Sequence, residues 1–202
     1  MEKTDQQLVA DYLNGEESAF PALLSRYLKP VYNFAYRMTA SKADAQDIAQ
    51  ETFFKAWRNL KKYRREKNFK TWLFAIARNT AIDYLRKRKD FTFSDLSARS
   101  GSGFGGEGEE GDNNFEDTLA DLGPLPDEII ARAEDQKNME ELISKLSPAY
   151  REMLLLRYDS QFTFDEIGKI LGKPLDTVKS QHRRALIELR KIIESQPPHR
   201  LP

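Results

Sequence analysis

Residues 68–89 combine side chains that can bind nucleic acid. Trp72, Asn79 and Arg86 follow one another at intervals of seven residues. On a helix, this spacing brings the three side chains onto one line. An aromatic ring, an amide and cations on one surface suit a single nucleic acid strand, because bases stack on rings and phosphates require positive charge. We therefore interpret the stretch, with Arg86 and Lys87 at its basic end, as a surface for single-stranded nucleic acid.

Two aromatic residues in this region are candidates for stacking on bases. Tyr63 lies among cations in the run KKYRREKN, so we expect its ring to be exposed and to be the better candidate. Trp72 is more simply explained by packing, because a Trp within an apolar helix is usually buried. Leu73, Ile76 and Ala77 occupy neighbouring positions, and we expect them to form the core face of the same helix.

A second set of basic and polar residues lies near the C-terminus. A short helix, the turn LGKPLD and a longer helix predict a helix-turn-helix, whose second helix enters the major groove of DNA. Val178, His182, Ala185 and Leu189 share one face of that second helix. The opposite side then presents to DNA a set of four residues: Lys179, Ser180, Arg183 and Arg184. A helical hairpin with a basic solvent-facing surface is the alternative, and we interpret His182 as a histidine at the edge of the core.

The residues needed for catalysis or metal binding are scarce. The chain has no Cys, and its two His are far apart, at positions 182 and 199. There is no Gly-rich phosphate loop, and the pairs Glu16-Glu17 and Glu109-Glu110 are adjacent in sequence, without a fixed catalytic geometry. We therefore expect no catalytic residues, no metal site and no cofactor.

Charge is unevenly distributed along the 202 residues, although the net charge is zero. Residues 55–90 carry 13 Lys or Arg against 3 Asp or Glu, whereas residues 91–145 carry 4 against 14. This separation favours a block that binds a polyanion beside an acidic tether. No apolar run approaches the roughly 18 residues of a membrane span. The N-terminal residues lack a secretory signal pattern, so we expect a cytoplasmic protein that does not insert into membranes.

The helical signals predict an all-α protein of two small domains. Residues 101–114 hold six of the ten Gly, which predicts a flexible acidic linker over 96–127. It separates a domain at 1–95 from a helix-turn-helix domain at 128–195, and residues 196–202 form a tail. In the second domain, Ser147 and Pro148 predict the start of a helix that continues through Arg157. Thr163 and Glu166 form a capping-box pattern for a helix that Gly172 ends. Asp176 is expected to cap a longer helix that reaches about Ile193.

Several of these segments resemble one protein family. The segments DAQDIAQETFFKAW at 44–57, FKTWLFAIARNTAIDYLRK, LSPAYREMLLLRY and TFDEIGKILGKPLDTVKS are similar to regions two and four of extracytoplasmic function (ECF) sigma factors. The similarity covers most of residues 5–93 and 128–193, in order and with a tether between. The resemblance implies a subunit that directs bacterial RNA polymerase to promoters and has no chemistry of its own.

The resemblance also implies roles for individual residues. Asp47, Gln50 and Glu51 fall in the segment that docks on the coiled coil of the largest polymerase subunit. Tyr63 and Asn79 match positions around the pocket for the base flipped out of the minus-ten element, with Arg86 and Lys87 alongside. Lys179, Ser180, Arg183 and Arg184 match the face that reads the minus-thirty-five element. The family also implies contact with the polymerase flap region, an acidic tether in the RNA path of polymerase, and a possible anti-sigma factor.

The family pattern and this chain differ at three positions of the predicted reading helix. The family often has a basic residue at the position of Gln181, an apolar one at His182 and Arg at Leu186. The alternative function is a free-standing helix-turn-helix regulator that binds duplex DNA without polymerase. That alternative leaves residues 47–51 and 63–89 without a function. Promoter binding that requires core polymerase would support the sigma factor, and promoter binding without it would support the regulator.

Overall fold

The computed structural model describes residues 3–63, 68–87 and 136–195, with the backbone alone over 136–140. Every regular element in these residues is helical. The predicted linker, the basic residues at 88 and 89 and the C-terminal tail lie outside the described residues. No helix of the described ranges has the length and apolar character needed to cross a membrane.

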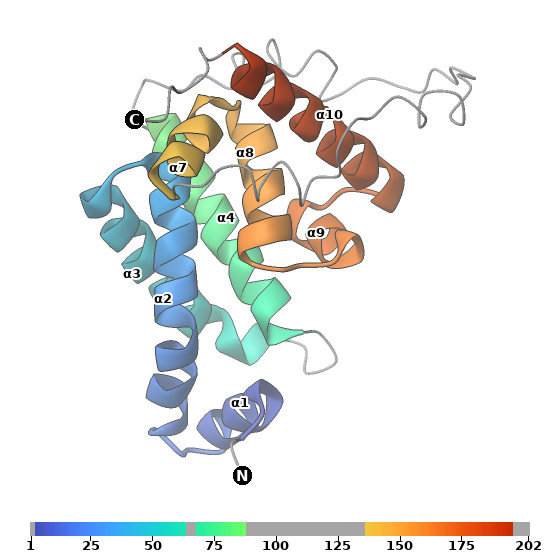
Figure 1. Ribbon diagram of the computed structural model, residues 1–202. Coiled ribbons are helices and arrows are strands. Elements are labelled where there is room, and N and C mark those ends of the chain that lie inside the picture. The colour runs from blue at the N-terminus through green and yellow to red at the C-terminus, as the bar shows by residue number, and fades with distance from the viewer. Residues whose placement is uncertain (1–2, 64–67, 88–135, 196–202) are drawn as a thin grey trace.

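Four helices form what we call the N-terminal lobe, residues 3–87 (Figure 1). They are α1 (Asp5–Leu13), α2 (Ala19–Thr39), α3 (Lys42–Asn59), which continues into a 3-10 turn (Leu60–Lys62), and α4 (Phe69–Lys87). Side chains define the starts of two of them: Thr4 and Gln7 form a capping box at α1, and Ser41 accepts a bond from the Asp44 N–H at α3. The backbone reverses between α2 and α3 at Ala40, which has a φ of 55°.

The C-terminal lobe, residues 136–195, contains four α-helices and one wider turn. They are α7 (Gln136–Lys145), α8 (Pro148–Leu154), a π-helical turn (Leu155–Asp159), α9 (Phe164–Leu171) and α10 (Leu175–Glu194). The predicted cap at Ser147, the capping box of Thr163 with Glu166 and the C-cap at Gly172 are confirmed.

Two predicted helix boundaries in this lobe need correction. The regular part of the helix that starts at Pro148 ends at Leu154, and Arg157 lies in the wider turn that follows. The last helix begins two residues earlier than predicted, because Pro174 occupies the N-cap and supplies a preset φ of −60°. Asp176 therefore lies in the first turn, where its charge favours the helix dipole.

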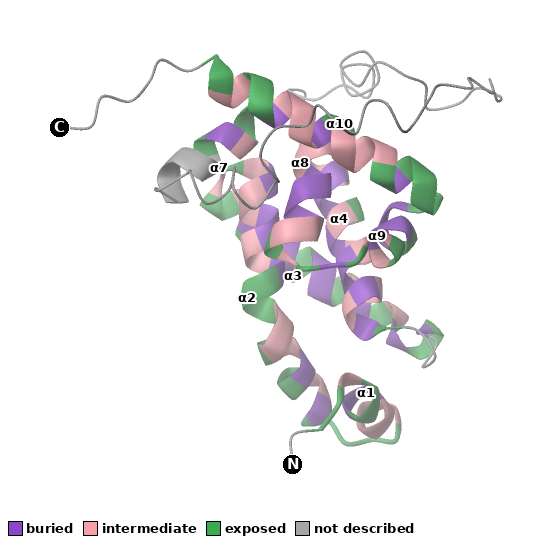
Figure 2. Cartoon of the chain, turned by 45° about the vertical axis from the view of Figure 1, so that its right-hand side comes forward, coloured by how far each residue is buried: buried purple, intermediate pink, exposed green. Residues whose placement is uncertain are grey.

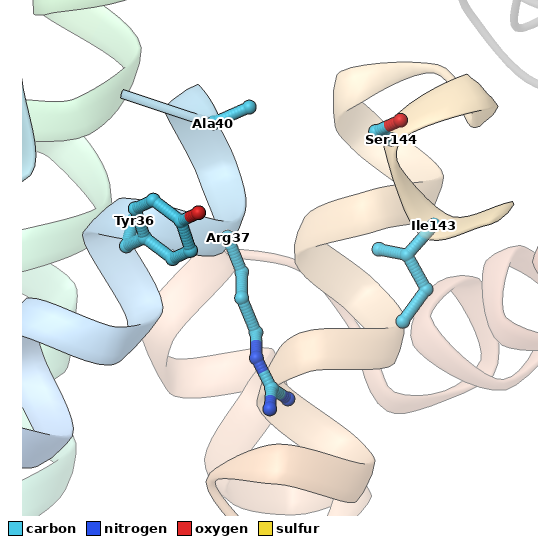
Figure 3. A pocket seen from close by; sticks show the side chains of 5 residues that line it. All are labelled: Tyr36, Arg37, Ala40, Ile143 and Ser144. Carbon is cyan, nitrogen blue, oxygen red and sulfur yellow. The ribbon is translucent and has the colours of Figure 1, made fainter. Parts of the chain in front are cut away.

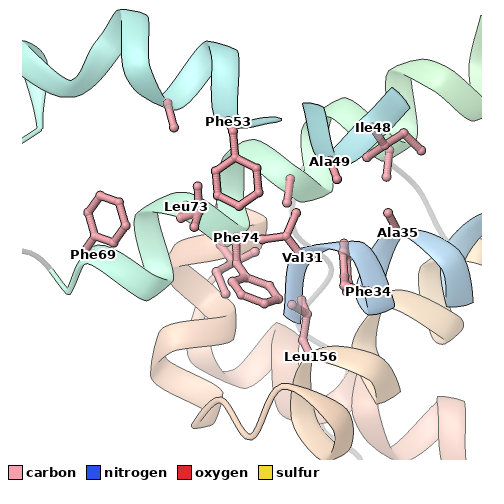
Figure 4. Packing of buried hydrophobic residues seen from close by; sticks show 14 of the residues in the cluster. Val31, Phe34, Ala35, Ile48, Ala49, Phe53, Phe69, Leu73, Phe74 and Leu156 are labelled. Atoms are coloured by element: carbon pink, nitrogen blue, oxygen red, sulfur yellow. The ribbon is translucent and has the colours of Figure 1, made fainter. Parts of the chain in front are cut away.

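The two lobes share one buried core (Figures 2 and 4). Phe34 and Phe74 of the N-terminal lobe pack in the same cluster as Leu156 and Phe162 of the C-terminal lobe. The rings of Phe74 and Phe162 meet edge to face with centroids 5.0 Å apart. A second, smaller cluster between α7, α8 and α10 contains Leu142, Leu146, Leu154, Ala185 and Leu189. Helix α4 packs against α3 on one side and against α9 on the other.

Polar contacts surround the apolar contact between the lobes. Arg37 pairs with Asp159 at 2.6 Å, and Lys70 Nζ donates to the Ser160 carbonyl at 2.6 Å. Arg151 Nη1 donates to the Met38 carbonyl at 2.8 Å. A small pocket beside these contacts is lined by Tyr36, Arg37 and Ala40 of α2 and by Ile143 and Ser144 of α7 (Figure 3). Both sides of the interface thus contribute apolar and charged groups.

Candidate nucleic-acid interface and partner surface

Helix α4 has a core face and an exposed face, as the sequence predicted. Leu73 and Ala77 are fully buried, whereas Ile76 is only partly buried at the edge of the same cluster. Asn79 is exposed, as are Arg86 and Lys87 at the basic C-terminal end of the helix. Arg86 is paired within its own helix with Asp83 at 3.2 Å. The amide and the two cations are therefore accessible to a ligand.

The expectation of an exposed Tyr63 ring is wrong for this conformation. Tyr63 is 5% exposed, and its ring packs 5.5 Å from that of Phe69 and 5.2 Å from that of Trp72. The 3-10 turn after α3 bends the chain so that the ring falls against the first turn of α4. Burial, with a smaller contribution from the charge of Asp5, raises the pKa of the Tyr63 hydroxyl. Trp72 is half-buried in the same aromatic cluster, in agreement with the packing interpretation.

Asn79 is connected to the C-terminal lobe through its neighbour Arg78. Arg78 Nη1 donates to Asn79 Oδ1 at 3.2 Å. The same guanidinium binds both carboxylate oxygens of Glu152, with Nε–Oε2 at 2.8 Å and Nη2–Oε1 at 3.1 Å. Burial lowers the pKa of Arg78, but its bond to Glu152 and the charge of that carboxylate raise it by more, so the net pKa is raised. Nothing in the sequence indicated this pair, since its members are 74 positions apart.

Helix α3 presents one continuous exposed stripe. Asp47, Gln50 and Glu51 are all exposed, and they recur at three- or four-residue steps that place them on one face. Asp47 Oδ2 accepts from the Tyr84 hydroxyl at 3.1 Å, and Glu51 lies 3.5 Å from Lys55. The carboxylates therefore face solvent with only weak local partners.

Apolar residues extend the same stripe. Phe54 is 50% exposed and Trp57 48% exposed, which is unusual for such large side chains. Trp57 Nε1 donates to the Tyr12 hydroxyl at 2.7 Å, and Arg58 lies over the Phe54 ring. We call the six exposed residues the α3 stripe: Asp47, Gln50, Glu51, Phe54, Trp57 and Arg58.

The helix-turn-helix is held by a close approach at one glycine. A Cβ added at Gly168 in α9 would lie 2.9 Å from the Lys173 carbonyl, closer than such atoms approach in proteins. The Gly172 backbone, with a φ of 65°, then turns the chain towards α10. These two positions fix how α10 leaves α9, and thus which face of α10 is outward.

The outward face of α10 carries part of the predicted DNA-reading set. Lys179 and Arg184 are exposed, whereas Ser180 and Arg183 are partly buried. Gln181, at the position where the resembling family often has a cation, points inward instead. It accepts a bond from Lys173 Nζ at 2.6 Å and donates to the Ala149 carbonyl at 3.2 Å.

His182 lies at the core edge, as predicted. Its Nε2 is 3.1 Å from the Tyr158 hydroxyl, and its ring meets that of Phe164 edge to face. Burial, with a smaller contribution from the charge of Arg157, lowers the pKa of His182 to about 4. The described residues contain no group of three or more His, Asp or Glu side chains placed to hold a metal ion.

Comparisons with known proteins agree with this division into two lobes. A family model for sigma-70 region 2 matches residues 23–91, and one for sigma-70 region 4 matches residues 136–189. The chain is 32% identical over 191 residues to the ECF RNA polymerase sigma factor SigW of Bacillus subtilis, covering 95% of this chain and 97% of that protein. It is 30% identical to the RNA polymerase sigma-H factor of Pseudomonas aeruginosa, covering 96% of this chain and 95% of that one.

Two solved structures have the same fold. One is CnrH in complex with the cytosolic domain of CnrY, with a TM-score of 0.65 and 21% identity over 96% of this chain and 99% of that one. The other is the sigma factor RpoE of Bartonella quintana in complex with the anti-sigma factor NepR, with a TM-score of 0.60 and 24% identity over 88% and 98%. Both lobes, their order along the chain and the level of identity lead to one assignment: the chain belongs to the ECF sigma factors of the sigma-70 family.

Proposed function

We propose that this ECF sigma factor directs core RNA polymerase to promoters through three separate surfaces. These are the α3 stripe, the exposed face of α4 and the outward face of α10. The observation that carries the proposal is the α3 stripe. A free-standing DNA-binding regulator has no use for exposed aromatic residues beside exposed carboxylates, whereas a subunit that docks on a large protein does.

The α3 stripe fits the coiled coil of the largest polymerase subunit. Exposed aromatic residues supply the apolar centre of an interface, and charged residues around them orient the partner. Phe54 and Trp57 have that central role, with Asp47 and Glu51 at one end and Arg58 at the other. The two carboxylates call for a basic partner surface.

The exposed face of α4 fits melted minus-ten DNA. The Asn79 amide carries both donors and an acceptor, so it can read the edge of a base that has left the duplex. Arg86 and Lys87 are placed to bind phosphates of the same strand. Tyr63 is buried, so it contributes to this surface only by packing against Trp72.

The outward face of α10 fits the duplex of the minus-thirty-five element. Arg184 can bond a guanine edge in the major groove, and Lys179 a guanine or a phosphate. Ser180 and Arg183 flank them, partly covered in this conformation. The residues that hold α10 against α8 and α9, among them Gln181 and His182, set its angle rather than the sequence it reads.

The functional regions follow the two lobes. Residues 1–95 act in polymerase binding and promoter melting, and residues 128–195 act in upstream recognition, with 96–127 as the tether between them. An anti-sigma factor is a further proposed partner, since two proteins of this fold were solved in complex with the cytosolic domain of CnrY and with the anti-sigma factor NepR. The proposed contact with the polymerase flap region belongs to the C-terminal lobe.

One experiment tests this function against the free-standing regulator. Genomic DNA of the source organism is transcribed in vitro with core polymerase, with and without the protein, and the new transcript starts are mapped. We expect defined starts that need both components, and DNA protection upstream of those starts only when core polymerase is present. Protection of the same sites by the protein alone would support the regulator instead.

A further inference from the structure

One ion pair with a buried carboxylate joins the two lobes. Arg78 of α4 and Glu152 of α8 are joined by two hydrogen bonds, and the Glu152 side chain is 1% exposed. A carboxylate removed from water in this way requires a paired cation. While the lobes are closed, Arg78 is therefore committed to Glu152.

The same guanidinium also touches the residue that we assign to base reading. Arg78 Nη1 donates to Asn79 Oδ1 at 3.2 Å. The planar fork of Arg fits a carboxylate and a phosphate in the same two-bond geometry. Glu152 thus occupies the position beside Asn79 that a phosphate of a bound strand would take.

The closed arrangement is too compact to engage both promoter elements. The names minus-ten and minus-thirty-five place the centres of the two promoter elements about 25 base pairs apart. This is about 85 Å along a duplex at roughly 3.4 Å per pair. The 20 residues of α10 span only about 30 Å, and the two lobes are in direct contact through α4 and α9. Promoter binding therefore requires the lobes to separate, which exposes Arg78 and Glu152.

We propose that Arg78 exchanges partners during this opening: it binds Glu152 in the closed protein and a DNA phosphate beside Asn79 in the open one. Glu152 acts as an internal phosphate mimic that keeps the minus-ten surface occupied until the lobes part. This proposal rests on the proposed function and adds Arg78 to its DNA-binding residues. In the open state, Lys173 remains in the C-terminal lobe, near enough for its charge to interact with Glu152.

The segment that docks on the N-terminal lobe contains one residue with a left-handed backbone. Gln161 has a φ of 58°, which is uncommon for a residue with a Cβ. On either side of it, the Ser160 carbonyl accepts from Lys70 and the Phe162 ring packs on Phe74. The Ser160 and Phe162 N–H groups donate to the Leu155 and Leu156 carbonyls, so the turn keeps its own hydrogen bonds when the lobes separate.

The test measures binding of the full-length protein to short fluorescent single-stranded oligonucleotides of random sequence. A phosphate contact is independent of sequence, and each one steepens the dependence of log K on log salt by about 0.7 for single strands. We expect Glu152→Gln to bind at least about threefold more tightly than the wild type, because a larger fraction is open. Its salt slope should equal that of the wild type, because both proteins make the Arg78–phosphate contact once they are bound.

Two variants separate the partner exchange from other effects. Glu141→Gln removes the same charge from the same lobe, at an exposed position paired with Lys145 in α7, and should leave the affinity unchanged. Arg78→Gln combined with Glu152→Gln should open the lobes equally but have a salt slope shallower by about 0.7 than that of Glu152→Gln alone. An equal gain with Glu141→Gln, or an equal slope in the double variant, would overturn the proposal.

Opening is measured independently by a distance. The chain has no Cys, so Lys29→Cys and Lys191→Cys accept two spin labels at exposed positions of α2 and α10. Glu152→Gln should shift the distance distribution to longer values, and no shift together with an unchanged affinity counts against the proposal. If circular dichroism shows that Glu152→Gln does not fold, Asp159→Asn takes its place. This variant weakens closure by breaking the exposed pair with Arg37. The salt slope of its oligonucleotide binding should then become shallower when Arg78→Gln is added. If the wild type gives no core-dependent transcription, the proposed function is refuted instead. The binding assays do not involve transcription, so the two failures can be told apart.

Discussion

Burial separates the aromatic and polar residues around α4 into those that pack beneath the exposed surface and those that make up that surface. Tyr63 and Trp72 lie within an aromatic cluster with Phe69, whereas Asn79 is open to solvent one residue from the ion pair of Arg78. A substitution in the first group should act through the free energy of unfolding. A substitution in the second group should act through DNA.

Tyr63→Ala should destabilise the protein. The ring is 5% exposed and its removal leaves a cavity beside Phe69 and Trp72, so the free energy of unfolding should fall by about 3 kcal/mol. Tyr63→Phe keeps the ring and should cost far less. Urea unfolding followed by circular dichroism measures both, and equal stability of Tyr63→Ala and the wild type would restore the exposed-ring interpretation.

Asn79→Ala should impair promoter opening and spare stability. The side chain is exposed, so its loss should change the free energy of unfolding by less than about 0.5 kcal/mol. Holoenzyme carrying the variant should still bind the closed promoter but form fewer open complexes, read as permanganate reactivity of unpaired thymines. Gln6→Ala, at an exposed position of α1, is the control. Wild-type permanganate signals from Asn79→Ala would exclude the amide from base reading.

His182 should make stability depend on pH between about 4 and 6.5. In the folded chain the pKa of His182 is lowered to about 4, so below pH 6.5 the unfolded chain takes up a proton that the folded chain does not. Stability is therefore fully present above pH 6.5 and is lost as the pH falls towards 4. Partial exposure reduces the effect, and we expect a loss on the order of 1 kcal/mol between pH 7 and pH 5. His182→Gln should lack this component, so parallel stability profiles of the two proteins would contradict the assignment.

At the scale of elements, the α3 stripe and the α9–α10 turn show how helix geometry sorts residues. One side of α3 is buried through Ile48, Phe53 and Ala56, so the residues on the opposite side stay exposed. In α9, the absent Cβ of Gly168 lets the Lys173 carbonyl approach closely and fixes the turn before α10. The first feature leaves an exposed stripe on α3, and the second sets which face of α10 is outward.

Reversing charge at Asp47 and Glu51 should weaken binding to core polymerase. Both carboxylates are exposed on the α3 stripe, so the double variant Asp47→Lys and Glu51→Lys should fold normally. Loss of charged bonds to a basic partner surface should weaken binding by about 1 to 3 kcal/mol. Glu16→Lys with Glu17→Lys, two exposed residues before α2, reverses the same charge off the stripe and should bind like the wild type. Recovery of core polymerase at wild-type level by the stripe variant would disprove the assignment.

At the scale of the whole molecule, one core joins lobes whose family matches are 45 residues apart in the chain. The buried cluster that contains Val31 and Phe74 also contains Leu156, Phe162 and Ile167 (Figure 4). Polar groups around it, among them the pair of Arg37 and Asp159, are of the kind that water can replace. These polar contacts therefore offer little resistance to the proposed opening of the lobes.

Phe74 and Phe162 should be energetically coupled. Their rings are in contact at 5.0 Å, so a double-mutant cycle with Phe74→Ala and Phe162→Ala should give an interaction free energy of about 0.5 to 3 kcal/mol. The pair of Phe74→Ala with Leu189→Ala, which removes a buried residue of the second cluster, is the control and should be additive. Additivity of the Phe74 and Phe162 substitutions would mean that the lobes are open in solution.

Local sequence determined the elements and the outward sets of residues. The capping box at Thr163, the C-cap at Gly172 and the apolar repeat of α4 depend on bonds within a few residues, so their pattern can be read directly from the chain. The exposure of Asn79, Lys179 and Arg184 follows from the same periodicity. The exposure of the aromatic residues of the α3 stripe could have been predicted from the same periodicity, because they continue the spacing that begins at Asp47.

Only the tertiary structure decided which of these surfaces are covered. Tyr63 lies among cations in the sequence, but a 3-10 turn and the first turn of α4 bury its ring. Arg78 and Glu152 each look like ordinary surface charges, and their pairing depends on the approach of two lobes across 74 positions. Contacts between distant segments depend on the summed packing of whole helices, which no local pattern encodes. For this reason the exposure of residues such as Asn79 and Arg184 was evident from the sequence, whereas the contact between the lobes became visible only in the fold.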